Sequence, residues 1–223
     1  MTDPNAPESI ESQVAQQPDD INTIVNNTRR IVFSDRKGLR KYQIVRAPQE
    51  MINQWKAGVD EFVAAITTKD GPKLKELMQN NGREIGDVYA VHDMITDEHL
   101  DDIDIKLLAI GLFVLREKSP WSLTRTRLKV LLGGNIKMES TFDPDGCANC
   151  YDVAAVVKEL AKTYGIEGNL HGKHWEHAHF ETVDGKVSDP MYGYKRGGLF
   201  QTREKFEDFK KNMAYAKRKS KKK

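Results

Sequence analysis

Apolar residues recur at helical spacing through the first half of the chain, after a short segment in which they alternate. Two β-branched and aromatic runs between residues 30 and 45 flank Asp35-Arg36-Lys37-Gly38 and predict a hairpin. The helical pattern then predicts four helices, which span residues 48–66, 73–79, 96–118 and 120–132. The third is apolar almost all round from Ile103 to Leu115, so we expect it to be central and buried.

The pattern changes after Asp143. A loop rich in Asp, Gly and Asn leads into an amphipathic helix, with Cys150 on its first turn and Gly165 at its end. A strand is predicted near residues 169–172, and alternating residues on both sides of Asp184-Gly185 predict two further antiparallel strands joined by a tight turn. The chain is therefore expected to have an α+β fold, in which a helix headed by Cys150 packs on a small antiparallel sheet behind a mainly helical N-terminal region.

Charge divides the chain further. The net charge of the 223 residues is only +2, but the first 28 residues carry acids and no base, whereas the sequence ends in AKRKSKKK. We expect a disordered acidic tail over residues 1–28, a mainly helical region over 29–134, a core over 135–212 and a disordered basic tail over 213–223. The basic tail is a candidate contact for nucleic acid or an anionic surface by counterion release.

Composition excludes several classes of protein. With 39% hydrophobic and 30% charged residues, the chain is neither fibrous nor disordered throughout. No apolar stretch reaches the roughly 20 residues that a membrane-spanning helix needs, and no secretion signal is expected, so the predicted location is cytoplasmic. Calcium-loop and phosphate-binding glycine patterns are lacking, so no cofactor is expected. The only cysteines, Cys147 and Cys150, are too few for a disulfide framework.

The order of chemistry-bearing residues indicates a thiol enzyme. Cys150 begins a helix, where unpaired N–H groups and the helix dipole are expected to lower the pKa of a thiol. His177 follows on one predicted strand and Asp189 on the next. A thiolate, an imidazole base and an orienting carboxylate from three successive elements are the parts of a Cys-His-Asp site. The alternative for Cys150 is a small core residue, the usual fate of a free cysteine.

The region from Phe142 to Tyr194 resembles the transglutaminase-like cysteine superfamily, whose papain-like Cys-His-Asp site is carried by a Cys-headed helix and an antiparallel sheet. The matching segments are the C-x-D-x-A helix start 150–154, the helix end 160–166, the strand 169–172, the His-Ala-x-x-Glu strand 177–181 and the Asp-Pro strand 188–190. The resemblance implies a transglutaminase-like catalytic core over 135–212, with Cys150 as nucleophile, His177 as base and Asp189 as orienting residue. His179 stands where the family has Trp.

The same resemblance implies acyl transfer on a protein or peptide substrate. A thiolate would attack an amide carbonyl, and water or an amine would resolve the thioester, so that the enzyme is a protease, an amidase or an acyltransferase. One oxyanion donor is expected to be the backbone N–H of Cys150. Further candidate donors are the side chains of Asn149, Trp121 and Asn135.

The register of the two strands on either side of Asp184-Gly185 tests whether the Cys-His-Asp triad can form. A two-residue Asp184-Gly185 turn would place Asp189 on the face opposite His177, whereas a three-residue loop with Gly185 in the left-handed region places Asp189 opposite His179 and diagonal to His177. The triad therefore requires the longer loop. Because His179 shares the face of His177, it remains a rival base.

Two alternatives remain open. Cys147 and Cys150, with His171, His174, His177 and His179, offer enough ligands for a Cys₂His₂ zinc site, although a whole helix and a strand separate the two groups. The second alternative is a non-catalytic protein of the same fold that binds protein or nucleic acid.

Overall fold

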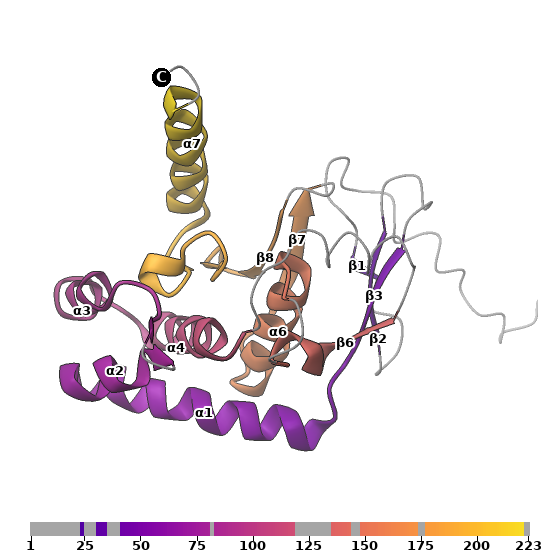
Figure 1. The fold of residues 1–223 in the computed structure, drawn as a ribbon, viewed down its shortest axis with the longest axis horizontal. Helices are drawn as coiled ribbons and strands as arrows, with labels where there is room; N and C mark the ends of the chain where they lie inside the picture. Colours follow the sequence, from indigo (N-terminus) through magenta and orange to yellow (C-terminus); the bar gives the residue numbers. More distant parts are fainter. Residues whose placement is uncertain are drawn as a thin grey trace, which may run out of the picture.

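A computed structural model describes residues 23–24, 30–34, 41–80, 83–118, 135–143, 148–173 and 177–220 (Figure 1). The elements of the first half are β1 (Thr23–Ile24), β2 (Arg30–Ser34), β3 (Lys41–Val45), α1 (Gln49–Thr67), α2 (Gly71–Leu77), β4 (Gln79–Asn80), β5 (Arg83–Glu84), α3 (Val88–Asp97) and α4 (Asp102–Glu117). Those of the second half are β6 (Asn135–Lys137), η2 (Met138–Thr141), α6 (Cys150–Thr163), β7 (Gly168–Lys173), β8 (His177–Thr182), β9 (Val187–Ser188), η3 (Tyr194–Arg196), β10 (Leu199–Phe200) and α7 (Arg203–Ser220).

The predicted hairpin near the N-terminus is confirmed. Strands β2 and β3 pair antiparallel, with Ile31 opposite Ile44, and β6 adds to β3 in parallel. Strand β1 pairs with β2, although its residues fall within the range where a disordered tail is expected. Pairing with a neighbouring strand supplies the hydrogen bonds that local composition does not reveal.

Helix α1 follows the predicted pattern, beginning after Pro48 and burying Val59 and Phe62 on its inner face. It ends where Lys69 adopts a left-handed conformation with φ of 54°, and Asp70 then caps α2 by accepting a hydrogen bond from the backbone of Lys73 at 2.9 Å. The break predicted between these helices is therefore confirmed, with α2 starting slightly earlier than expected.

The predicted helix over 96–118 is two helices. Thr96 does not cap α4, because it lies inside α3 and its hydroxyl donates back to the carbonyl of His92 at 3.0 Å. Asp101 is the cap instead. Its carboxylate accepts the backbone N–H of Asp104 at 2.9 Å, and the carboxylate of Asp104 accepts the backbone N–H of Asp101. This reciprocal arrangement satisfies the unpaired donors of the first turn. The expected burial of α4 is confirmed, since its residues from Leu107 to Leu115 are buried.

Helix α4 joins the two halves of the fold. It packs on α1, on α6 and on β9 and β10, so the helical layer and the C-terminal sheet share one core (Figure 1). Lys186, beside the start of β9, adds a polar link because its ammonium group lies 2.5 Å from Asp101 and 2.8 Å from Asp104. The order of the sheet is β10-β9-β8-β7, all antiparallel, and α6 packs on β7 and β8. The fold is thus α+β.

Helix α7 differs from the prediction for the C-terminus. It continues to Ser220, through most of the range 213–223 where a disordered tail is expected, and it projects away from the body of the molecule (Figure 1). The segment is rich in Ala, Lys and Arg, which are strong helix formers.

Several expectations lie outside the described residues, among them the helix over 120–132 and nearly all of the acidic tail. Within the described ranges, no helix combines the length and the apolar character that crossing a bilayer demands.

Candidate active site

A buried capping arrangement fixes the first turn of α6, where Cys150 lies. The side-chain oxygen of Asn149 accepts the backbone N–H groups of Tyr151 at 2.8 Å and Asp152 at 3.0 Å. The carboxylate of Asp152 accepts the N–H of Asn149 in return, at 3.3 Å. Both capping residues are buried, so this geometry is held without competition from water. The Asn149 side chain, a candidate oxyanion donor by sequence, therefore uses its oxygen as a helix cap.

The turn between β8 and β9 has the longer form that the triad requires. Phe180 pairs with Ser188, which leaves residues 183–185 as the loop and sets Asp189 in register with His179. Gly185 has φ of 85°, and its N–H donates to the carbonyl of Thr182 at 3.1 Å. Glycine adopts this left-handed conformation without the strain that a Cβ would impose. The predicted register is confirmed.

His177 and Asp189 are hydrogen-bonded through Nε2 and Oδ2. Two further hydrogen bonds position Asp189. Its Oδ1 accepts the backbone N–H of Tyr192 at 3.0 Å, and its own backbone N–H donates to the carbonyl of Gly198 at 2.8 Å. Only 1% of the residue is exposed. A carboxylate that accepts Nε2–H leaves Nδ1 of His177 as the basic nitrogen. Nδ1 has no hydrogen-bond partner among the residues that the structure describes.

Tyr192 is a site residue that the sequence did not reveal. Its ring lies parallel to the imidazole of His177, with 3.6 Å between ring centroids and 4° between planes. Tyr192 thus fixes both partners of the His177–Asp189 hydrogen bond: its backbone N–H donates to Asp189, and its ring stacks on His177. The only sequence signal for Tyr192 is an aromatic residue three positions after Asp189, and this pattern does not distinguish a site residue from a residue that packs in the core.

The thiol of Cys150 lies against β8, and its ionisation differs from the prediction. The pKa of Cys150 is raised to about 12, chiefly by burial; the charges of Asp189 and Asp152 also raise it, and the backbone N–H groups of Ala178 and Cys150 lower it. The expected lowering by the helix N-terminus is therefore wrong as a net effect, because desolvation of the thiolate outweighs the backbone donors. Deprotonation of Cys150 near neutral pH consequently needs a base.

His179, the rival base, has a different environment. Its ring contacts Phe206 of α7 at 4.6 Å between centroids, and its Nε2 lies 3.9 Å from the carboxylate of Glu181. The pKa of His179 is lowered to about 3, chiefly by burial and to a smaller extent by the neighbouring His171 and His177. Asp189 bonds His177 rather than His179, although His179 is the residue directly in register with it.

The residues of the zinc alternative are only partly described. Cys147 and His174 lie outside the described ranges, as does Trp121, the second candidate oxyanion donor. Within those ranges, no cluster of three or more His, Cys, Asp or Glu side chains is arranged to hold a metal ion. Asn135, the remaining candidate donor, lies on β6 and pairs with Gln43 of β3 in the other sheet. A zinc site that includes Cys147 and His174 remains a prediction.

Comparison of the chain with protein-family models, with curated proteins and with solved structures gave no match. The resemblance to the transglutaminase-like superfamily rests on the motifs between Phe142 and Tyr194 alone.

Proposed function

We propose that the chain is a transglutaminase-like cysteine enzyme that cleaves or transfers amide bonds of a protein or peptide through a thioester. The observation that carries the proposal is the partly buried hydrogen bond between His177 and Asp189, formed close to Cys150 at the start of its helix. An imidazole oriented by a buried carboxylate, next to a thiol at a helix start, is the arrangement that nucleophilic catalysis uses.

The proposed reaction assigns each proton. The Sγ of Cys150 attacks the amide carbonyl while its proton passes to Nδ1 of His177, and the carbonyl electron pair moves onto oxygen. The backbone N–H of Cys150, at the first helical position, is the expected donor to that oxyanion. When the C–N bond breaks, His177 returns the proton to the leaving amine. Water or a second amine then attacks the thioester while its proton passes to Nδ1 of His177. The C–S bond breaks as His177 delivers that proton to Sγ, which regenerates the thiol.

The raised pKa of Cys150 decides how the thiol is activated. In the proposed mechanism Cys150 is a neutral thiol at rest, so its proton moves during the attack and no thiolate–imidazolium pair forms beforehand. Asp189 stabilises the imidazolium that forms in the transition state and keeps the imidazole in the required tautomer.

An activated ester tests the proposal. p-Nitrophenyl acetate should acetylate Cys150 in an initial burst, which releases one equivalent of nitrophenolate per chain before the thioester turns over and increases the intact mass by one acetyl group. Cys150→Ser should lose both signals. Cys147→Ala is the matched control, and it should keep them. Acetylation that persists in Cys150→Ser, or a folded protein that is inert to the ester, would overturn the proposal and leave a binding function.

The pH dependence of alkylation gives a separate prediction. In a Cys147→Ala background, the rate of iodoacetamide alkylation should rise by about tenfold per pH unit from about pH 7 to about pH 10, because the thiolate fraction grows with no plateau below a pKa of about 12. Mass spectrometry with time follows the reaction. A plateau already reached near neutral pH would mean that the free protein holds a thiolate–imidazolium pair, contrary to the mechanism above.

A further inference from the structure

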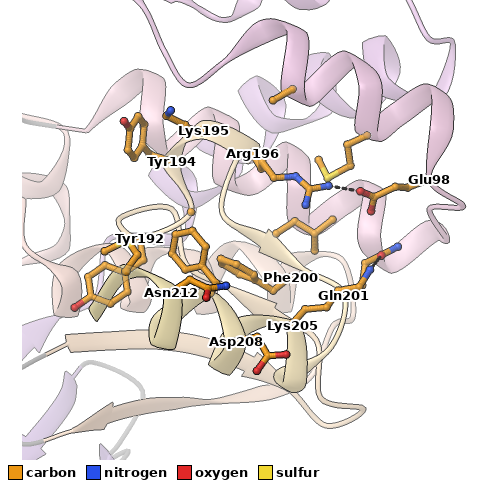
Figure 2. A pocket seen from close by; sticks show the side chains of 16 residues that line it. Glu98, Tyr192, Tyr194, Lys195, Arg196, Phe200, Gln201, Lys205, Asp208 and Asn212 are labelled. Carbon is orange, nitrogen blue, oxygen red and sulfur yellow. Dashed lines mark hydrogen bonds and ion pairs between the residues drawn. The ribbon is translucent and has the colours of Figure 1, made fainter. Parts of the chain in front are cut away.

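A cleft of about 780 Å³ lies next to the candidate site, between α3, the segment 192–201 and α7 (Figure 2). Its apolar lining comes from Met94, Leu199, Phe200, Phe209 and Met213. This volume falls in the range of pockets that bind small molecules or peptide side chains. None of these residues has a part in the chemistry proposed for Cys150.

Tyr192 connects the cleft to the proposed base. The residue lines the cleft, and its ring also stacks on the imidazole of His177 at 3.6 Å. One aromatic ring therefore separates the cleft from the imidazole. Successive residues of an extended peptide are about 3.3 Å apart. A substrate with its scissile bond at Cys150 thus has a side chain within reach of the cleft.

Three cations and two carboxylates line the cleft, and one of the carboxylates, Asp208, is neutralised by Lys211 at 3.0 Å, so the charge at the rim favours an anionic group. Arg196 is neutralised by an ion pair with Glu98, on the side of the cleft opposite Tyr192 in Figure 2. The ammonium group of Lys205 donates to the side-chain oxygen of Gln201 at 2.7 Å. Lys195 also lines the cleft and is exposed, and its ammonium group has no ion pair with any other residue in the described part of the chain.

We propose that this cleft binds a bulky apolar side chain of the peptide substrate, with a nearby carboxylate of the same peptide at Lys195. The inference rests on the proposed function, because it makes the cleft a specificity subsite of the Cys150 site. The apolar lining takes the side chain out of water, and the unpaired cation selects peptides with an adjacent acidic group.

The first test measures binding independently of catalysis. Anilinonaphthalenesulfonate combines an aromatic body with one anionic group, and its fluorescence reports entry into an apolar site. Asn212→Trp, which adds bulk at the cleft wall on α7, should weaken binding of this probe by about tenfold, because the indole fills space that the probe would occupy. Lys195→Gln should weaken it by about threefold. Asn53→Trp and Lys75→Gln, both exposed and outside the cleft, are the matched controls and should bind as the unmodified protein does.

The second test uses turnover. The unmodified protein should be acylated faster by p-nitrophenyl phenylpropanoate than by p-nitrophenyl acetate, and Asn212→Trp should reduce that ratio by about tenfold. If neither ester acylates the protein, the proposed function fails, and probe binding still decides whether the cleft is a site. If acylation proceeds while Asn212→Trp and Lys195→Gln change neither the ratio nor probe binding, the subsite is wrong. Probe binding that strengthens as a dimer dissociates on dilution would show that a second copy covers the cleft, which also overturns the proposal.

Discussion

Replacing His177 with alanine is expected to slow acylation of Cys150 by about 10³-fold or more, the loss that follows removal of the base from a nucleophile–base pair. The thiol of Cys150 has a pKa raised to about 12, so without a base the reactive thiolate is scarce at neutral pH. The measurement is the initial rate of nitrophenolate release from p-nitrophenyl acetate, with circular dichroism to show that the variant is folded.

The matched control is His179→Ala, two residues away on the same strand. This variant should keep most of the acylation rate, because the carboxylate of Asp189 bonds His177 and the ring of His179 packs against Phe206. Its expected cost is a loss of stability of about 1 kcal/mol, through the missing ring contact with α7. A large rate loss in His179→Ala together with a small one in His177→Ala would transfer the role of the base to His179.

Local signals in the sequence predicted the parts of the site that depend on backbone conformation. Asp184-Gly185 indicated a turn, and the demand that Asp189 reach a histidine selected the form in which Gly185 is left-handed, which the structure has. The start of α6 at Cys150 was likewise visible in the polar loop before an amphipathic stretch. Both features are set by residues close together in the chain.

Of the features that the sequence did not reveal, one is local and the others depend on contacts between distant segments. Helix α3 was missed because Thr96 has the character of a cap, whereas its hydroxyl bonds four residues back to the carbonyl of His92 within the same helix. The raised pKa of Cys150 comes first from burial, which depends on how α6 packs against β8. The backbone donors at the helix end lower this pKa, but desolvation of the thiolate opposes them and is larger. The role of Tyr192 depends on a loop that folds back onto β8.

The glycine contact that holds this loop gives the prediction with the largest effect on stability. A Cβ built at Gly111 of α4 would lie 1.8 Å from the carbonyl oxygen of Gly197, so Gly111→Ala forces the helix and the loop apart. Overpacking of this kind typically costs about 1–3 kcal/mol, and a clash with backbone on both sides places the expected loss at the upper end, about 3 kcal/mol. Urea unfolding followed by circular dichroism measures the loss.

Displacing the same loop should also reach the site. The carbonyl of Gly198, next to Gly197, accepts the backbone N–H of Asp189 at 2.8 Å, so movement of the loop disturbs the carboxylate that orients His177. Gly111→Ala is therefore expected to slow acylation by p-nitrophenyl acetate in the fraction that remains folded. Gly165→Ala is the matched control: its φ is 72° but no atom lies within 4 Å of the added Cβ, so it should cost about 1 kcal/mol of backbone strain and leave acylation unchanged. Equal losses of stability in the two variants, with acylation intact in both, would mean that α4 does not brace the loop behind Asp189.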